Sequence, residues 1–554
     1  MAEARPPPLL SAAAIWRVAD LLRGGMEPAE YGPVILVFTM LRRLELSRAR
    51  PARWLDAVAR APDPLACLDR LTNRLPGVVR DIISQLEVMP LARRLARADL
   101  LGGLAAHFTA LDLSPARHGT EAMARLFEEL VHHFADTRRT GAHFTPPEVT
   151  DLMVDLVFAP DGPGARHNLY DPAAGTGALL GRAADRLRQR GITVDLFGQE
   201  ISHRACALCR ADMLLRGRAP GQIVCGDTLA HDGHAGRRFA RMLSNPPFGL
   251  DWRHIRAAIQ AEHAQGHAGR FAPGLPRVAD GSMLFMLHLV AHMRSPRAGG
   301  ARIGVVTHGA ALTGGSADSG ESAIRRYLVE HDLIDAVIAL PADMFVNTGI
   351  ATYVWILDNN RPAARRGTVR LVDATGLWQR ALSGGGEKRR EMTSYHIDAV
   401  LRACTVDAAM DVLLRDGADG APVAWQVLAH DAPTPDGAAD MRRTPFSCLL
   451  PGREFLYRSL MVTRPGRDGA PVRTAFRVGM EHDPQAWFSQ MIRPYDPDAR
   501  LDTTRTATGC AISFARYFHH PVPLRPLQEI EADLRRSMAR LVALMPGGEP
   551  TADP

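Results

Sequence analysis

Seven short apolar runs between residues 168 and 358 constrain most strongly how this chain can fold. Each run is rich in residues that favour β-strands, and stretches of helical length and amphipathic pattern separate most of them. They cover residues 168–171, 193–198, 222–227, 239–244, 302–308, 334–341 and 351–358. Strands that alternate with helices indicate an α/β fold with a parallel, doubly wound sheet. Because residues 342–350 are too few for a crossover helix, the last two runs are expected to form an antiparallel hairpin at the end of the sheet.

The regions on either side of these runs have different patterns. From residue 12 to about residue 135, apolar residues recur at intervals of three and four, which predicts a helical N-terminal region. Residues 411–515 are rich in Gly, Asp and Pro and lack periodicity, so a loop-rich, irregular insert is expected there. Residues 525–545 predict an amphipathic helix that packs either on the rest of the chain or on a partner. Its apolar face consists of Leu527, Ile530, Leu534, Met538, Leu541 and Leu544.

Composition bounds the class of protein. The 554 residues carry a formal net charge of +6, which mildly favours an acidic partner such as nucleic acid. Seven scattered cysteines do not form the disulfide framework of a small secreted protein, so a cytoplasmic location is expected. No apolar run approaches the roughly 20 residues needed to span a bilayer, and the first residues lack the features of an export signal.

One group of residues is compatible with a metal site. His203, Cys206 and Cys209 lie close together in sequence and Cys225 follows them, but no second Cys-x-x-Cys pair stands at zinc-ribbon spacing. The alternative is that residues 202–216 form a helix whose two thiols face the interior, where cysteine behaves as a small apolar residue. We therefore expect no metal site.

The first of the seven runs ends in Asp171 and leads into a glycine-rich turn. Glycine permits a tight turn and the close approach of a ligand, and the helix that follows offers free N–H donors at its N-terminus. Glu200 ends the next run, where its carboxylate can bind both hydroxyl groups of a ribose, and Asp227 ends the third run, where an adenine amino group would lie. The turn supplies the candidate cofactor-binding residues Asp171, Ala173, Ala174, Gly175, Thr176 and Gly177. These features alone would also fit a dinucleotide such as NAD.

The fourth run ends in Asn245-Pro246-Pro247-Phe248, and this motif selects one chemistry. The exocyclic amine of a base is a poor nucleophile because its lone pair is delocalised into the ring. The side-chain carbonyl of Asn245 and the main-chain carbonyl of Pro246 can hold its two hydrogens, which favours the tetrahedral nitrogen that methyl transfer needs. The two prolines fix the backbone, and Phe248 can stack on an extruded base, a contact worth roughly 1–3 kcal/mol. We therefore assign Asn245, Pro246, Pro247 and Phe248 as candidate catalytic residues.

At these residues the sequence resembles the adenine-N6 DNA methyltransferases, whose Asn/Asp-Pro-Pro-Phe/Tyr signature is matched completely. Residues 141–149 resemble the segment that closes over the methionyl end of S-adenosylmethionine in the modification subunits of type I restriction-modification systems. Residues 15–45 and 314–360 are similar to the same family. The resemblance adds His143, Phe144, Thr145 and Pro146 to the candidate cofactor-binding residues. The next position, Pro147, departs from the basic residue that this family often carries there.

This resemblance implies a fold, a reaction and a set of partners. It implies a class I, Rossmann-like methyltransferase domain with a seven-stranded mixed sheet, and transfer of a methyl group from S-adenosylmethionine to the N6 amine of a flipped adenine in DNA. The implied partners are DNA, a specificity subunit that reads the sequence and a second copy of the methyltransferase subunit, which a translocase-nuclease restriction subunit can join. Together, the resemblance and the pattern of the chain predict the domains 1–137 (helical), 138–410 (methyltransferase), 411–515 (an irregular region that the resemblance does not cover) and 516–554 (helical tail).

Two other functions are compatible with the sequence. A protein glutamine N5-methyltransferase would also present a planar NH2 group to Asn-Pro-Pro, but such enzymes do not usually have a large helical N-terminal domain. A catalytically silent, methyltransferase-like assembly scaffold is the second alternative. Against it stands the presence of Asp171, Glu200, Asp227 and the whole motif from Asn245 to Phe248.

Overall fold

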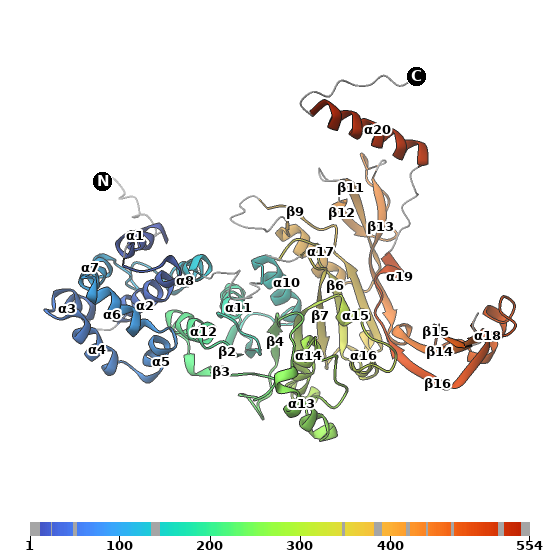
Figure 1. Ribbon diagram of the computed structural model, residues 1–554, viewed down its shortest axis with the longest axis horizontal. Coiled ribbons are helices and arrows are strands. Elements are labelled where there is room, and N and C mark those ends of the chain that lie inside the picture. Colours follow the sequence, from blue (N-terminus) through green and yellow to red (C-terminus); the bar gives the residue numbers. More distant parts are fainter. Residues whose placement is uncertain are drawn as a thin grey trace. The chain divides into compact units, whose positions relative to one another are not determined.

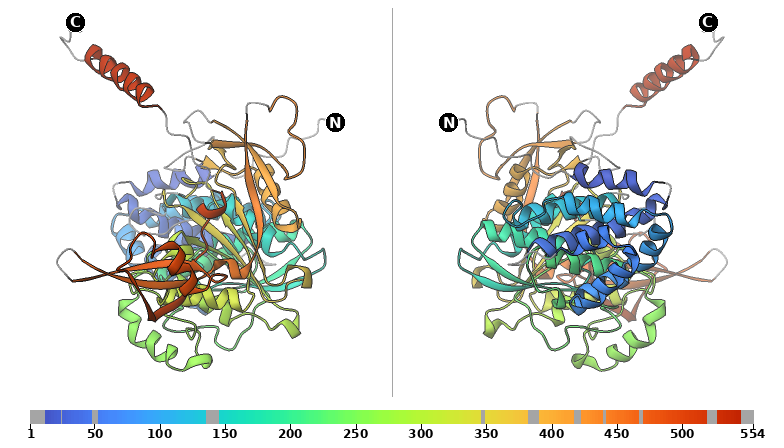
Figure 2. Two further views of the ribbon diagram at one scale, coloured as in Figure 1. Left: turned by 90° about the vertical axis from the view of Figure 1, so that its right-hand side faces the viewer. Right: turned by 90° about the vertical axis from the view of Figure 1, so that its left-hand side faces the viewer.

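The computed structural model, drawn in Figure 1 and in two further views in Figure 2, divides into two compact units. These units are Met1–Ser513 and Phe514–Pro554, and each is described by itself. The structure describes residues 12–23, 25–47, 53–134, 145–345, 349–381, 390–416, 422–438, 441–466, 470–518 and 526–544.

The first unit begins with a bundle of helices. They are α1 (Ala12–Leu22), α2 (Pro28–Leu46), α3 (Trp54–Arg60), α4 (Pro64–Arg74), α5 (Gly77–Gln85), α6 (Val88–Arg97), α7 (Leu101–Ala110) and α8 (Thr120–Phe134). Four consecutive residues of α2, Val34 to Val37, are each at most 4% exposed. A helix that is apolar around its whole circumference lies inside a core, so α2 is the central helix of this bundle. Over the described residues, the predicted helical N-terminal region is confirmed.

An 11-stranded mixed sheet follows the bundle. Its strands are β1 (Arg166–Asp171), β2 (Thr193–Glu200), β3 (Ile223–Cys225), β4 (Arg241–Ser244), β5 (Arg302–His308), β6 (Ile334–Ala339), β7 (Thr352–Asp358), β8 (Thr368–Asp373), β11 (Met410–Asp416), β12 (Pro422–Ala429) and β13 (Arg442–Pro451). They lie in the order β12-β11-β13-β8-β6-β7-β5-β4-β1-β2-β3. All seven predicted runs contain a strand. The predicted antiparallel pairing of β6 with β7 is confirmed, although this hairpin lies inside the sheet and not at its end.

Two expectations about this region are wrong. The sheet has four strands more than the seven expected, because β8 adds to β6 in parallel and β13, β11 and β12 follow in antiparallel order. Residues 411–515, which were expected to be irregular, contain much of these additional strands. β13 pairs with β8 from an earlier part of the chain, and the β11–β12 hairpin adds to β13, so cross-strand pairing fixes a conformation that the local Gly and Pro content does not indicate.

Helices cover both faces of the sheet. They are α10 (Pro147–Val157), α11 (Ala178–Gln189), α12 (His203–Leu215), α13 (Arg256–His263), α14 (Ser282–Ala291), α15 (Ala310–Thr313), α16 (Gly320–Glu330) and α17 (Ser394–Thr405). Leu169 of β1 packs in a core with α10, α11 and α17, whereas Tyr170 contacts His288 of α14. Successive side chains of a strand point to opposite faces, so α14 covers the face opposite to α10 and α11. The remaining short elements are β9 (Gln379–Arg380), β10 (Arg390–Glu391), η1 (Pro220–Gln222), η2 (Arg253–Ile255), η3 (Gly266–Ala268), η4 (Pro296–Ala298), η5 (Ala363–Arg365) and η6 (Gly452–Phe455).

Helix α12 belongs to two hydrophobic cores at once. Cys206, Cys209 and Met213 pack in the core of the sheet. Ala207, Leu208, Ala211 and Leu215, on other sides of the helix, pack in the core of the N-terminal bundle. The prediction that both thiols of this helix face the interior is confirmed. In addition, Cys206 forms a disulfide with Cys225, which removes both sulfur atoms from the metal site that the sequence left open.

The first unit also contains a separate three-stranded antiparallel sheet. Its order is β15-β14-β16, with β14 (Leu456–Pro465), β15 (Pro471–Gly479) and β16 (Arg500–Cys510). Helix α18 (Pro484–Met491) covers one face of this sheet, where Phe488 packs with Val462 and Ala499. This sheet accounts for the rest of the region that was expected to be irregular.

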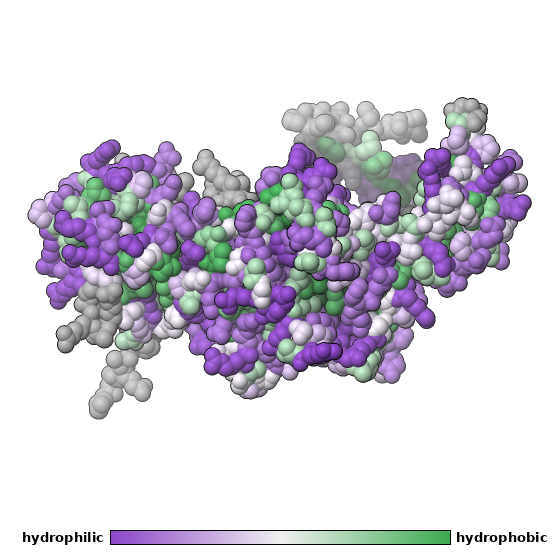
Figure 3. Space-filling model, turned by 90° about the horizontal axis from the view of Figure 1, so that it is seen from below, coloured by the Kyte–Doolittle hydropathy of each residue, from purple (hydrophilic) through white to green (hydrophobic). Residues whose placement is uncertain are grey.

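The second unit contains α19 (Ala515–Phe518) and α20 (Leu527–Leu544), which confirms the predicted C-terminal helix. The apolar residues Leu527, Ile530, Leu534, Met538 and Leu541 of α20 are between 47% and 70% exposed. Most of the protein surface visible in Figure 3 is hydrophilic, and hydrophobic residues appear there as scattered patches. Among the helices that the structure describes, none has both the length and the apolar character needed to cross a lipid bilayer.

Candidate active site

The candidate residues gather at one edge of the central sheet. β1 pairs in parallel with β2 and β4, and β2 pairs in parallel with β3. The carboxyl ends of these strands therefore meet at the same edge, which is where ligands bind in doubly wound sheets. Asp171 and Glu200 end β1 and β2, and Asp227 and Asn245 follow β3 and β4 closely. Residues that are up to 74 positions apart in the chain thus come together.

Asp171 joins the glycine-rich turn to the catalytic strand. Its Oδ1 atom accepts hydrogen bonds from the backbone N–H of Ala173 at 2.9 Å and from the hydroxyl of Ser244 at 2.8 Å. The residue is only 2% exposed. Burial raises the pKa of Asp171 to about 7, although both hydrogen bonds favour the ionised form. Ser244 directly precedes Asn245, so one carboxyl group sets the positions of both candidate sites.

The glycine-rich turn requires two glycines for different reasons. Gly177 has φ +90°, and a Cβ atom there would lie 2.8 Å from the sulfur of the buried Cys209. Gly175 has φ +55°, but a Cβ atom there would meet no atom within 4 Å. Positive φ values favour glycine at both positions. Gly177 is therefore needed for close packing against α12, whereas Gly175 borders free space beside the turn.

Glu200 and Asp227 are each held by backbone donors. Glu200 accepts the N–H of Gly175 at 2.8 Å with Oε2 and the N–H of Ser202 at 2.8 Å with Oε1. Burial raises the pKa of Glu200 despite these hydrogen bonds. Asp227 accepts the N–H of Leu229 at 2.9 Å with Oδ1, and its Oδ2 atom lies 3.6 Å from Nε2 of His254. Each carboxylate is thus fixed in place while keeping lone pairs for a ligand.

Asn245 is oriented by a residue 100 positions earlier in the chain. Its side-chain nitrogen Nδ2 donates a hydrogen bond to the hydroxyl of Thr145 at 3.0 Å. Within the part of the chain that the structure describes, no donor contacts the Oδ1 atom of Asn245. The carbonyl oxygen that the proposed chemistry needs is therefore available.

The other residues of the motif differ in exposure. Pro246 is buried, Pro247 is exposed and Phe248 is partly buried. The ring of Phe248 meets the ring of His308 edge to face, with centroids 5.6 Å apart. Phe248 also packs against the core of the central sheet.

His308 and Asp280 support Phe248, and the sequence analysis missed both. His308 ends β5, the strand next to β4, and its Nε2 atom lies 2.9 Å from Oδ2 of Asp280. Burial opposes ionisation of Asp280, but hydrogen bonds from His308 and Ser282 outweigh it and hold the pKa below its usual value. The position of His308 at a strand end beside the catalytic strand is the signal that could have identified it.

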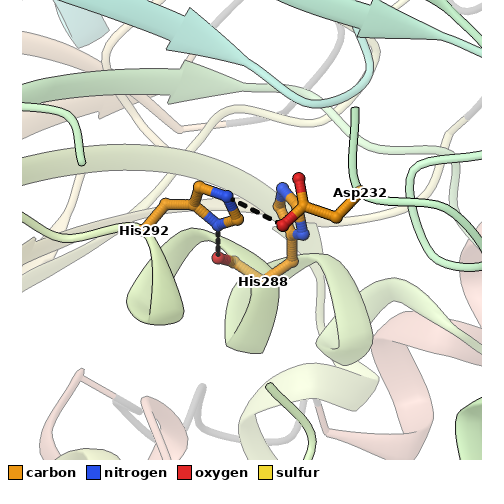
Figure 4. A group of neighbouring side chains, drawn as sticks. All are labelled: Asp232, His288 and His292. Atoms are coloured by element: carbon orange, nitrogen blue, oxygen red, sulfur yellow. Dashed lines mark hydrogen bonds and ion pairs between the residues drawn. The ribbon is translucent and has the colours of Figure 1, made fainter. Parts of the chain in front are cut away.

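A buried group of Asp232, His288 and His292 lies on the side of the sheet covered by α14 (Figure 4). His292 donates from Nδ1 to the carbonyl of His288 at 2.9 Å, and its Nε2 atom lies 3.1 Å from Asp232. His288 contacts the hydroxyl of Tyr170 with Nε2 and a guanidinium nitrogen of Arg270 with Nδ1, both at 2.9 Å. Both nitrogens of His288 thus have partners, so the group lacks a third free ligand for a metal ion. Burial also lowers the pKa of His288, which keeps its ring neutral.

The structure describes most of the predicted cofactor-binding residues. Thr145 contacts Asn245, and Pro146 precedes α10, of which Pro147 is the first residue. Proline suits that first helical position because the missing N–H would have no helical partner there, which explains the departure from a basic residue. His143 and Phe144 lie outside the described residues.

Comparison with known proteins agrees with this geometry. Residues 118–416 match the N-6 DNA methylase family, and residues 11–53 match the HsdM N-terminal domain family. The chain is 22% identical over 443 residues to the type I restriction enzyme MjaIX methylase subunit of Methanocaldococcus jannaschii, which covers 70% of this chain and 75% of that relative. It is 28% identical over 259 residues to the type I restriction enzyme MpnII methylase subunit of Mycoplasma pneumoniae, which covers 44% of this chain and 45% of that relative.

A solved structure shares the fold. The type I restriction-modification system methyltransferase subunit from Streptococcus thermophilus superimposes with a TM-score of 0.59 at 23% identity, over 71% of this chain and 92% of that one. The family match itself spans more than half of the 554 residues. The chain therefore belongs to the N-6 DNA methylase family.

Proposed function

We propose that this chain is the methyltransferase subunit of a type I restriction-modification complex and that it methylates the N6 amine of a flipped adenine in DNA. Membership of the N-6 DNA methylase family supports this reaction class. The observation that carries the assignment of the site is the hydrogen bond from Asn245 Nδ2 to Thr145. It fixes the amide so that the carbonyl oxygen is the group left to accept a hydrogen from the substrate amine.

The geometry of the glycine-rich turn fits S-adenosylmethionine. The free space beside Gly175 admits a ligand close to the backbone, and Glu200 and Asp227 offer lone pairs to ribose hydroxyls and to an adenine amino group. Asp171, Ala173, Ala174, Thr176 and Gly177 would shape the turn around the cofactor, with His143, Phe144, Thr145 and Pro146 at its methionyl end. When bound, S-adenosylmethionine supplies a methyl group activated by a sulfonium charge.

The residues of the motif would act on the target base. Asn245 Oδ1 and the carbonyl oxygen of Pro246 accept the two hydrogens of the N6 amine, which concentrates its lone pair on nitrogen. Pro247 holds the backbone in place, and Phe248 stacks on the base and offsets part of the few kcal/mol that extrusion costs. Since both acceptors are neutral amide oxygens, the proton that the nitrogen loses passes to water.

The proposed complex contains a specificity subunit that reads the DNA sequence and a second copy of this chain, and a restriction subunit can join it. The exposed apolar side chains of α20 fit a helical partner, because an amphipathic helix buries its apolar face in a complementary groove. We assign α20 to the contact with the specificity subunit. We expect the complex to work in the cytoplasm, where its DNA substrate is accessible.

A methyl-transfer assay tests the proposed function. The native complex is incubated with tritium-labelled S-adenosylmethionine, DNA and soluble protein, and the labelled product is digested and identified. Label on N6 of adenine is the expected result. Label on a glutamine side chain of a protein would instead support a protein methyltransferase, and absence of label from every acceptor, with intact cofactor binding, would support a silent scaffold.

A further inference from the structure

The sheet β15-β14-β16 has one packed face and one open face. On the packed face, Val462 is 4% exposed and lies against Phe488 of α18. Val462 pairs with Leu501, which belongs to the same cluster. Adjacent residues of a strand point to opposite faces, so Thr463, the next residue of β14, belongs to the face that α18 does not cover.

Three arginines lie on this open face. Thr463 pairs with Arg473 of β15 on one side and with Arg500 of β16 on the other. Ser459, four residues before Thr463 in β14, pairs with Arg477. Directly paired residues share a face, and so do residues an even number of positions apart in a strand. Arg473, Arg477 and Arg500 therefore form one basic surface, and all three are exposed.

A single acidic residue offsets the charge of this surface only in part. Asp502 is the only acidic residue within the three described strands. It accepts hydrogen bonds from the backbone and the hydroxyl of Thr504, and it lies 3.7 Å from Arg505. Among the residues that the structure describes, none forms an ion pair with Arg473, Arg477 or Arg500. Asp502 pairs with Met461 and so lies on the same face, where hydrogen bonds from Thr504 and the charges of Arg505 and Arg473 lower the pKa of its carboxyl. One carboxylate beside three arginines leaves an excess of positive charge, which favours an anionic partner.

The sheet is fixed to the catalytic edge of the central sheet. The buried side chain of Arg325 donates to the carbonyl of Cys510 at 2.7 Å and to that of Ala311 at 3.2 Å. The backbone N–H of Ile512 donates to the carbonyl of Leu312 at 2.9 Å. Ala311 and Leu312 follow shortly after His308, whose ring contacts Phe248. The end of β16 is therefore anchored a few residues from the candidate site for the target base.

The distance along β14 from this anchor to the arginines corresponds to a few base pairs of duplex DNA. From Leu456, which pairs with Cys510, to Thr463, β14 advances seven residues, or about 23 Å at about 3.3 Å per residue. A B-form duplex rises about 3.4 Å per base pair on each strand, so the basic surface lies within roughly seven base pairs of the anchor. Duplex that flanks a target base bound at Phe248 would pass within reach of the arginines.

We propose that Arg473, Arg477 and Arg500 bind the phosphate backbone of duplex DNA that flanks the methylated site. This inference rests on the proposed function, because it takes DNA as the substrate. Arginine suits this role because its planar guanidinium forms paired hydrogen bonds with phosphate oxygens. The hydroxyls of Ser459 and Thr463 add further donors beside the arginines. Such contacts position the duplex without reading its sequence.

The chemistry of the open face argues against a protein partner. Stable protein interfaces have an apolar, aromatic-rich centre that is depleted of charge. Here Ser459 and Thr463 pair with arginines, and Met461 between them pairs with Ala475 and Asp502. Tyr457, the aromatic residue of this face, is buried and lies under Arg477, with 4.9 Å between the guanidinium carbon and the ring centroid. The aromatic ring of this face is thus buried, and the partly buried Met461 lies among charged and polar side chains, which is unlike the apolar centre of a protein interface.

The test compares two double variants of the full-length chain, each assembled in its complex. Arg473→Gln/Arg500→Gln removes two charges from the open face. Arg464→Gln/Arg493→Gln is the matched control, because Arg464 belongs to the opposite face of β14 and Arg493 follows α18, and both are exposed. Binding of a fluorescent 40-base-pair duplex of mixed sequence is measured by anisotropy at several salt concentrations.

In the first variant, the slope of log affinity against log salt concentration should be shallower than in the wild type by about 1.8, as expected for two lost phosphate contacts. The control should keep the wild-type slope. Methylation at saturating DNA should be unchanged in both, with a higher KM for DNA in the first variant alone. Equal slopes in all three proteins would overturn the inference. The inference would also be overturned if the first variant did not assemble in its complex while the chain itself bound DNA with the wild-type slope. That result would indicate that the arginines contact a protein.

The two hypotheses fail separately in this experiment. If the wild-type complex transfers no label to DNA, the proposed function fails while the slopes still report on the basic surface. If label transfer is normal and the slopes do not differ, only the assignment of the basic surface fails. Unchanged thermal unfolding midpoints of both double variants confirm that neither has lost its fold.

Discussion

At the scale of residues, Thr145 orients the side-chain amide of Asn245. Thr145 accepts a hydrogen bond from the amide nitrogen, and among the described residues no donor contacts the amide oxygen, which we propose as the acceptor for the substrate. The oxygen is the only atom of this amide that can accept a hydrogen bond, which suits an amine as the substrate group. This arrangement explains why a side-chain amide, and not a stronger base, stands at the end of β4.

Substitution of Asn245 should separate catalysis from cofactor binding. Asn245→Ala should reduce the rate of methyl transfer by about 10²- to 10³-fold, as expected for loss of one preorganised polar group, and should change the affinity for S-adenosylmethionine little. Asn245→Asp, which keeps an acceptor oxygen, should retain part of the activity. Glu200→Ala should instead mainly lower the affinity for S-adenosylmethionine. Calorimetric titration and single-turnover methylation measure the two effects, and an equal loss of cofactor affinity in the Asn245 and Glu200 variants would contradict the assigned roles.

Asp171 makes the stability of the cofactor-free chain depend on pH. The pKa of its carboxyl is raised to about 7 in the folded chain, compared with about 3.9 in an unfolded one. The folded state therefore binds the proton more tightly, and this stabilisation, present in full below about pH 4, is lost as the pH rises through 7. The difference of about 3 pKa units corresponds to at most about 4 kcal/mol.

Asp171→Asn is the variant that reveals this effect. It keeps an oxygen for Ala173 and Ser244 but cannot ionise. Between pH 5 and pH 8.5, the thermal unfolding midpoint of the wild-type chain should fall relative to that of Asp171→Asn, without cofactor in either sample. Parallel pH curves would mean that this carboxyl is ionised at its ordinary pKa in the folded chain.

At the scale of elements, the glycine-rich turn links the cofactor site to α12. Gly177 lies against Cys209 of that helix, and the same helix carries Cys206, which is joined to Cys225 at the end of β3. The turn, α12 and β3 are therefore mutually constrained. A substitution in the turn should therefore alter the packing of α12 as well as ligand binding.

Alanine at the two glycines should have different effects. Both substitutions place a side chain at positive φ, which costs about 1 kcal/mol. Gly177→Ala adds a collision with Cys209 and should lower the unfolding midpoint more. Gly175→Ala meets no atom within 4 Å, so it should change stability less and instead reduce affinity for S-adenosylmethionine, because the methyl group enters the proposed binding space. Thermal unfolding and titration check this, and equal destabilisation by the two variants would contradict it.

Local pattern predicted the parts of the fold in which each element has its own signature. The seven runs from 168 to 358 and the motif at Asn245 fall into this group, since alternation with helices and strand-end position are both visible in the sequence. The strands β11 to β16 do not, because their region is rich in Gly, Asp and Pro, many of their exposed positions carry arginine and threonine, and β13 pairs with the distant β8. The contacts of Asn245 with Thr145 and of Phe248 with His308 depend on tertiary structure, so no local pattern predicts them.

At the scale of the whole molecule, the unit Phe514–Pro554 carries the surface that we propose for a partner. Its main helix carries exposed apolar residues along one side, including Leu534 and Leu541. Leu534→Lys/Leu541→Lys should abolish co-purification with the specificity subunit while leaving cofactor binding intact. Glu531→Gln/Arg535→Gln, changed at polar positions of the same helix, is the matched control and should assemble normally. Co-purification of the leucine variant at wild-type yield would exclude α20 as the contact.

The shared burial of α12 has a consequence for how nucleic acid can reach the catalytic edge. Side chains of α12 belong to both cores. A rotation of the N-terminal bundle against the central sheet would therefore pull apolar side chains of this helix out of one core or the other. A movement of the bundle by itself would expose these apolar side chains to water, which costs free energy. We therefore expect DNA to reach the candidate site without a rotation of the bundle alone.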